Sequence, residues 1–344
     1  MKRMIFLILA VSILCAGCAN LFDGTYTSVT PHSQSGQTGG ALVAVNYGQL
    51  CQAIRIMARN GAALGLIDVS GYDRDTVEQD MYDAVKNIMT NDPVAAYAVQ
   101  NMHFSLKETE RQTAIQLKIS YLHDRSELQQ LRYVNWMHEG EAAIAAELEK
   151  SGMGLVLYID QYEEMDYSAW VQQWARENPQ AVMEIPSVTA VVYPAGGTSR
   201  LVELTFTYKN DRQTLRDMQQ QVTQMFAFAL MNVEGKEPYR QLYTFLTERF
   251  QTYQLVKTET PAYSLLMEGR GDAEAFALVY AALCRQAGVP CTVVTGTLNG
   301  KAHSWNQIYV DGMARYVDLL AGEYLEMTEN QMPGYEWDRL EKLG

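Results

Sequence analysis

The sequence lacks an excess of positive charge. Its 344 residues include 27 Lys and Arg against 40 Asp and Glu, which gives a formal net charge of −13. Because nucleic-acid binding needs a positive surface, this balance argues against a nucleic-acid ligand, and equally against electrostatic adhesion to anionic lipid. With 48% hydrophobic and 19% charged residues, the chain has the composition of a globular protein, long enough for two ordinary domains.

Cysteine is scarce too. The chain has five, and no CxxC or Cys/His spacing points to zinc or to a disulfide scaffold. Four of the five histidines are scattered, and we interpret them as surface or locally satisfied residues: His32, His103, His123 and His138. We therefore expect no metal ion and no cofactor.

The only long apolar run lies at the N-terminus. Lys2 and Arg3 precede Met4 to Leu14, a run too short to span a bilayer easily. The next residues, "LCAGC", resemble the lipobox of bacterial lipoproteins, although Cys15 stands where that family prefers Leu. The alternative is an ordinary secretory signal followed by a chance cysteine.

The lipobox resemblance implies a signal peptide at 1–17 and a diacylglycerol group on the sulfur of Cys18. Two acyl chains would anchor the protein stably, at the extracytoplasmic face of a bacterial cell membrane. Residues 18–40 are rich in Ser, Thr and Gly and are typical of a flexible tether.

A repeat fills the next region, 41–232. In each half, alternating and helical apolar periods predict a strand, a helix, two strands and a further helix. The clearest correspondence places "ISYLHDRSEL" on "FTYKNDRQTL", with Asp124 and Asp211 as helix N-caps. We expect an α+β architecture of tandem βαββα units, in which helices cover one face of an antiparallel sheet. Neither half contains catalytic groups, which favours a scaffold or ligand-presenting role.

A different domain is expected at 233–344, beginning near the helix at 237–253. Its main feature is a helix at 272–287, where Asp272 is a natural N-cap and Ala273 takes the first helical position. Gly288 and Pro290 are typical of its end. A thiol in the first turn of such a helix would have a lowered pKa, because the positive end of the helix dipole stabilises a thiolate.

Three strands should follow, joined by Asn299-Gly300 and by Asp311-Gly312 turns. Two-residue turns would set His303 opposite Gly296, which leaves room beside the imidazole. They would also set Asp318 diagonally on the same face, about 7–8 Å away between Cα atoms.

The combination resembles the transglutaminase-like, papain-like superfamily. The motif covers "GDAEAFA" from Gly271, "GVP" from Gly288, "VTG" from Val294, "HSWN" from His303 and "VD" at 317–318. The resemblance implies a papain-like α+β fold in which His303 is the general base, Asp318 orients it and Trp305 walls the cleft. Asp272, Glu274 and Gly296 would flank the site.

Ala273 stands where the family has its nucleophilic cysteine, so the acyl-enzyme chemistry of the family has no thiolate. Cys284 lies on about the same helix face but about 16 Å along the axis, too far to replace it. We interpret Cys291 as a core residue.

Three hypotheses follow. In the first, the protein is a lipid-anchored pseudoenzyme whose cleft binds a peptide, an amine or a cell-wall ligand without turnover. In the second, it is an active enzyme of non-thiol type, or an engineered inactive member of the cysteine protease and transglutaminase class that acts on amide bonds. In the third, it is a purely structural surface module.

Overall fold

The computed structural model describes residues 42–110, 112–231, 233–235, 237–250, 253–321 and 325–337. The expected signal peptide, Cys18 and the tether lie outside these residues. Among the helices of the described ranges, none is both long enough and apolar enough to cross a membrane.

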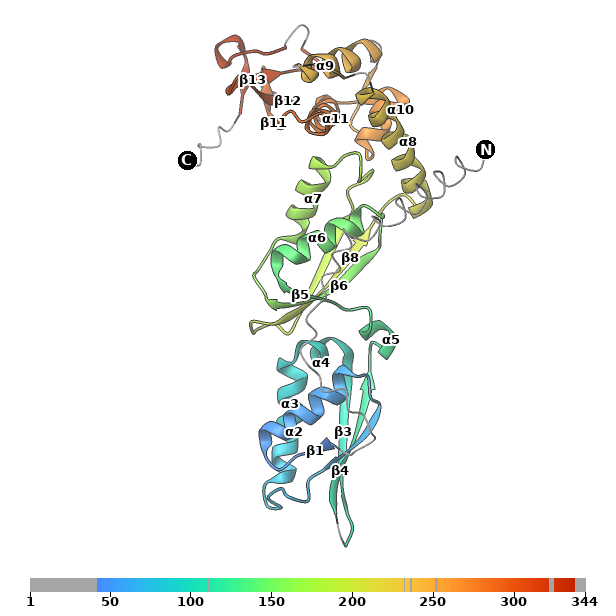
Figure 1. Ribbon diagram of the computed structural model, residues 1–344, viewed down its shortest axis with the longest axis vertical. Helices are drawn as coiled ribbons and strands as arrows, with labels where there is room; N and C mark the ends of the chain where they lie inside the picture. The colour runs from blue at the N-terminus through green and yellow to red at the C-terminus, as the bar shows by residue number, and fades with distance from the viewer. Residues whose placement is uncertain are drawn as a thin grey trace, which may run out of the picture. The chain divides into compact units, whose positions relative to one another are not determined.

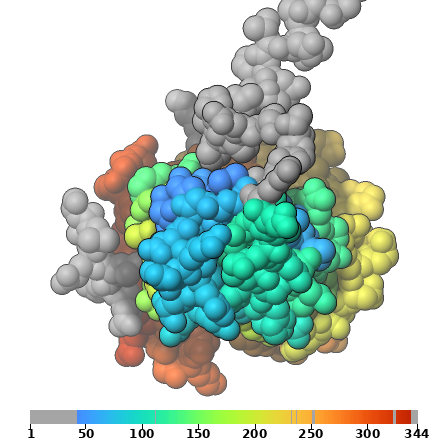
Figure 2. All heavy atoms as spheres, turned by 90° about the horizontal axis from the view of Figure 1, so that it is seen from below, coloured from blue at the N-terminus to red at the C-terminus, as the bar shows by residue number. Residues whose placement is uncertain are grey.

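The first repeat is a four-stranded mixed sheet with helices on one face (Figure 1). Its elements are β1 (Leu42–Val43), α2 (Tyr47–Arg59), β2 (Leu64–Asp68), α3 (Val77–Asn91), α4 (Pro93–Ala98), β3 (Val99–Glu108) and β4 (Thr113–Tyr121). The strand order is β1-β2-β4-β3, with β1 parallel to β2 and the other pairs antiparallel. Figure 2 shows the blue and cyan part of this repeat, which contains α2 and α3, beside the teal part, which contains β3 and β4.

The second repeat has the same topology. After the short α5 (Arg125–Leu128), its elements are β5 (Arg132–Trp136), α6 (Met137–Leu148), β6 (Gly154–Gln161), α7 (Tyr167–Glu177), β7 (Ser187–Tyr193) and β8 (Arg200–Thr207). Its strand order is β5-β6-β8-β7, and β5 is parallel to β6. The sequence-based prediction of a duplicated unit is therefore matched by two sheets of identical order.

The predicted βαββα order was incomplete. Each repeat opens with an additional strand and helix, so the unit is βαβαββ, and each sheet is mixed rather than antiparallel. A strand–helix–strand crossover returns the chain parallel to its first strand, which accounts for the parallel pair. In the second repeat, the strong helix signal at Asp124 yields only the one-turn α5, and β5 follows where the helix was expected to continue.

The two capping aspartates act as expected. Asp124 accepts hydrogen bonds from the backbone N–H groups of Ser126 and Glu127 and completes a capping box. Asp211 does the same for Gln213 and Thr214 at the start of α8 (Arg212–Leu230). The side-chain hydroxyls of Ser126 and Thr214, followed by these backbone donors, stabilise the ionised carboxylates and lower the pKa of both aspartates.

The repeats meet through the outer face of the second sheet, the face opposite α6 and α7. Tyr158, Leu201 and Tyr193 are register neighbours that form one row across this face. Together with Val94 and Tyr97 of α4 they belong to one apolar cluster. The first repeat therefore covers apolar surface that the second sheet would otherwise expose to water.

The C-terminal domain is built around one buried helix, α11 (Ala273–Gln286). Residues 275–284 of this helix are buried without a break, so α11 is apolar all round its middle turns. Around it lie α8, α9 (Pro238–Arg249), α10 (Pro261–Glu268) and a sheet of β11 (Cys291–Leu298), β12 (Lys301–Val310), β13 (Met313–Val317) and β14 (Tyr335–Glu336). The sheet order is β13-β12-β11-β14, and a two-strand pair joins β9 (Gln254–Leu255) to β10 (Arg270–Gly271).

Candidate functional site

The first turn of α11 has the predicted cap. The Asp272 carboxylate accepts the backbone N–H of Ala275 at 3.0 Å, and Ala273 is the first helical residue. The N–H groups of Ala273 and Glu274 cannot be bonded within the helix, because no preceding turn supplies carbonyls for them. A helix end of this kind attracts electron-rich groups.

Glu274 forms ion pairs with two cationic side chains. Its carboxylate lies 2.9 Å from Nη2 of Arg176, on α7 of the second repeat, and 3.9 Å from Nζ of Lys257. Arg176 could not be predicted as a site residue, because it lies outside the motif and in the repeat region. This ion pair links the repeat region directly to the residue that follows Ala273.

Both hairpins have the predicted register. His303 pairs with Gly296, and Asn306 pairs with Val317. The turn residues have the positive φ angles of type I′ turns, 51° and 75° at Asn299-Gly300 and 51° and 74° at Asp311-Gly312. The two turns fix which side chains share a face with His303.

His303 and Asp318 form a direct pair. Nε2 of His303 lies 2.5 Å from Oδ2 of Asp318, just beyond the end of β13. The same Oδ2 accepts the hydroxyl of Tyr335 at 2.7 Å, and Oδ1 accepts the backbone N–H of Leu320 at 2.9 Å. Three donors therefore hold the Asp318 carboxylate, which is 1% exposed.

This arrangement sets the chemistry of the imidazole. The Nε2 proton of neutral His303 is directed at Asp318, which leaves Nδ1 as a hydrogen-bond acceptor. The His303 side chain is 13% exposed, so its outer edge reaches solvent while the carboxylate does not. The pair can accept a proton or an N–H group from a molecule at the surface.

The direction of β12 along α11 places Ala273 at the His303 end of the sheet. Near the end of the helix, Cys284 lies beside Cys291, which pairs with Ile308. About two turns earlier, the carbonyl of Ala277 accepts Nδ2 of Asn306 at 2.8 Å. Continued in the same direction, the first turn of α11 lies towards His303.

Trp305 is placed differently from the expectation. It is fully buried in an aromatic and methionine cluster with Tyr316, Met327 and Met332, and does not form the surface of a cleft. Its ring stacks behind His303, with ring centroids 6.2 Å apart. Its Nε1 has no hydrogen-bond partner among the described residues. Trp305 supports the imidazole from the interior.

The space expected beside Gly296 is filled. A Cβ at this position would lie 2.1 Å from the carbonyl oxygen of Glu336 and 2.9 Å from Cβ of Trp337. The glycine therefore allows β14 to pair closely with β11. This segment carries Tyr335, a site residue that the motif did not assign.

The two cysteines of this domain are structural. Cys284 is completely buried and Cys291 is 2% exposed. Burial raises the pKa of the Cys291 thiol well above its ordinary value, since a thiolate is poorly solvated there. Neither sulfur is available to stand in for the thiol absent at Ala273.

Comparisons with known proteins agree with the motif. Residues 224–337 match the model of the transglutaminase-like superfamily. Among curated proteins, none matches the chain.

Three solved structures resemble parts of the chain. A TGase has 11% identity over 56% of this chain and 55% of its own, with a TM-score of 0.27. A protein from Cytophaga hutchinsonii, described without proof of activity as a cysteine protease, has 12% identity over 44% and 65%, with a TM-score of 0.27. EGTA-treated LapG of Legionella pneumophila has 16% identity over 38% and 73%, with a TM-score of 0.24. The chain thus spans less than two thirds of the first two relatives, and it carries a transglutaminase-like domain at its C-terminal end.

Proposed function

We propose that the transglutaminase-like domain is a binding module for an amide- or amine-bearing ligand, such as a peptide or a cell-wall fragment, and does not turn it over. One observation carries the proposal. The His303–Asp318 pair is intact and anchored by Tyr335, while the first residue of α11 is alanine. Alanine has no atom that could form an acyl-enzyme.

The two halves of the site suit the two ends of an amide group. A carbonyl oxygen of the ligand would accept from the N–H groups at the start of α11. The N–H of the same amide group would donate to Nδ1 of His303, because Nε2 of His303 is directed at Asp318. Glu274 would attract an amine, although Arg176 and Lys257 already compensate its charge.

The proposal places this module outside the cytoplasm, tethered by lipid at Cys18. The support is the lipobox-like "LCAGC" after the short apolar run. Metabolic labelling with a radioactive fatty acid tests this part. Label on the wild type that is absent from Cys18→Ser would support it, and unlabelled wild type would contradict it.

Calorimetric titration of the purified chain with glutamine-containing peptides and with short cell-wall peptides tests the binding role. We expect saturable binding, with no release of ammonia or of a free amine. His303→Ala should weaken binding about tenfold, because a buried hydrogen bond to the ligand is lost. His103→Ala, which removes an exposed imidazole from β3, is the matched control.

Two results would contradict the proposal. Turnover that disappears in His303→Ala would mean that the site uses non-thiol chemistry. Equal binding by the wild type and by His303→Ala would mean that the site does not hold the ligand.

A further inference from the structure

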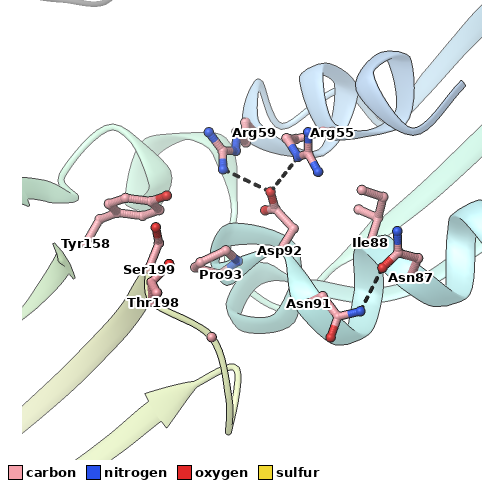
Figure 3. A pocket seen from close by; sticks show the side chains of 11 residues that line it. Arg55, Arg59, Asn87, Ile88, Asn91, Asp92, Pro93, Tyr158, Thr198 and Ser199 are labelled. Atoms are coloured by element: carbon pink, nitrogen blue, oxygen red, sulfur yellow. Dashed lines mark hydrogen bonds and ion pairs between the residues drawn. The ribbon is translucent and has the colours of Figure 1, made fainter. Parts of the chain in front are cut away.

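A cavity of about 360 Å³ lies far along the chain from the His303 site. It is lined from one side by α2, the end of α3 and the start of α4 in the first repeat, and from the other by Tyr158 and the β7–β8 loop of the second. Figure 3 shows its two arginines, Arg55 and Arg59, converging on Asp92, with Thr198 and Ser199 on the opposite side. The volume is near the lower end of small-molecule sites.

The charges in this cavity do not cancel. Asp92 is 1% exposed, and its Oδ1 accepts the backbone N–H groups of Val94 and Ala95. Its Oδ2 accepts Nε of Arg55 at 3.0 Å and Nη2 of Arg59 at 2.9 Å. One carboxylate thus faces two guanidinium groups, which leaves a positive charge in a chain whose net charge is −13.

The arginines retain donors for a ligand. Each guanidinium has five N–H groups and directs one of them at Asp92. The side chains of Arg55 and Arg59 remain 42% and 38% exposed. Arg59 also lies over the ring of Tyr158, with its Cζ 5.7 Å from the ring centroid, which restricts the orientation of its guanidinium plane.

The opposite wall supplies neutral polar groups. Ser199 donates its hydroxyl to Asp160, which leaves the oxygen lone pairs able to accept. Thr198 adds a further hydroxyl. On the side of the first repeat, Asn91 of α3 donates Nδ2 to Asn87, which leaves its carbonyl oxygen able to accept. These groups match the hydroxyls of a sugar.

We propose that this cavity binds a small hydroxylated anion, with a carboxylate or phosphate group on the two arginines and hydroxyls on the Thr198 side. The parallel N–H groups of a guanidinium can bind two oxygens of a carboxylate or of a phosphate at once. Asp92 orients the two guanidinium groups before the ligand arrives. The proposal does not depend on the function of the His303 site.

Calorimetric titration of the full chain with glucose 6-phosphate, glucuronate and glucose tests this site. We expect at least one of the two anions to bind saturably and glucose not to bind, and the stronger anion identifies the charged group. Arg59→Gln should weaken binding about tenfold and Thr198→Val about threefold. Arg216→Gln, which removes an exposed arginine of α8 that does not line the cavity, should leave binding unchanged.

Thr198→Val leaves the Asp92 contacts intact, so it remains informative if Arg59→Gln fails to fold. The proposal is overturned if neither anion binds, if glucose binds as well as both anions, or if binding is the same in Thr198→Val and in the folded Arg59→Gln variant as in the wild type.

Discussion

Asn306 donates its side-chain N–H to the main-chain carbonyl of Ala277, and this buried bond fixes β12 against α11. Ala277 lies four residues after Ala273 in the helix, and Asn306 lies three residues after His303 in the strand. The strand and the first helical turn are thereby held in a fixed relation by a bond in which neither Ala273 nor His303 takes part.

A cysteine introduced at position 273 should react unusually fast with an alkylating reagent. In Ala273→Cys, the thiol would occupy the first helical position, at the His303 end of the sheet, and both features favour the thiolate. We expect alkylation by iodoacetamide at pH 6–7 at least about tenfold faster than that of glutathione. Peptide mass spectrometry identifies the modified cysteine.

The native thiols of the described residues serve as internal controls, because Cys51, Cys284 and Cys291 are buried and should react only on unfolding. Adding His303→Ala should slow alkylation of the new thiol. A rate equal to that of glutathione in Ala273→Cys would show that the first turn of α11 no longer forms a thiolate site.

Arg176 should influence the same thiol from the second repeat. It is the nearer of the two cations that compensate Glu274, so Arg176→Gln in the Ala273→Cys background leaves only Lys257, 3.9 Å away, to offset the negative charge next to the new thiol. That charge opposes the thiolate and raises the thiol pKa, and we expect alkylation at pH 6.5 to slow by about two- to threefold. Arg216→Gln is the control, and 0.5 M salt should reduce the difference. An unchanged rate in low salt would mean that the Arg176–Glu274 pair does not reach the site electrostatically.

Gly296→Ala should loosen β14. The new methyl would overlap the carbonyl of Glu336, and backbone cannot yield as a flexible side chain can. We expect a loss of about 1–3 kcal/mol in stability and faster hydrogen exchange at residues 334–337, since over-packing displaces the segment. Gly196→Ala is a matched control, because a Cβ there meets nothing within 4 Å. Unchanged exchange in Gly296→Ala would mean that β14 is not held through this contact.

Alkaline pH should destabilise the first repeat through Tyr121. Its hydroxyl donates to the carbonyls of Met57 and Ala62, each at 3.2 Å, and burial raises the pKa of Tyr121 to about 12. Because the unfolded value is about 10, the protonated folded form contributes stability below pH 10 that is lost as the pH rises towards 12.

Thermal unfolding between pH 9 and 11 measures this loss. Tyr121→Phe should be less stable than the wild type at pH 8 by about 1 kcal/mol, and its stability should fall less steeply with pH, since it has one titrating group fewer. Tyr309→Phe removes an exposed phenol and should follow the wild type. Parallel curves for Tyr121→Phe and the wild type would contradict the assignment.

The parts of the site that the sequence predicts are those set by short-range chemistry. Asp272 fixes the start of α11, and the Asn299-Gly300 and Asp311-Gly312 turns fix the registers that bring Asp318 to His303. Each of these features depends on residues that are close together in the sequence.

The parts that escaped prediction depend on long-range packing. β14 has two residues, too few to show a period, and its place is set by Gly296 on another strand. The burial of Trp305 depends on Met327 and Met332, and Arg176 reaches Glu274 from another domain. β1, also of two residues, escaped for the same reason as β14.

The row of Tyr158, Leu201 and Tyr193 that receives α4 has a counterpart in the first sheet. There, the registers place Asp68, Ala114 and Lys107 in the corresponding row. A further unit docking in the same way would have to desolvate two charged side chains in this row, where the second sheet presents two tyrosines and a leucine. The two sheets, alike in strand order, therefore differ in the surface that they offer to a neighbouring unit along this row.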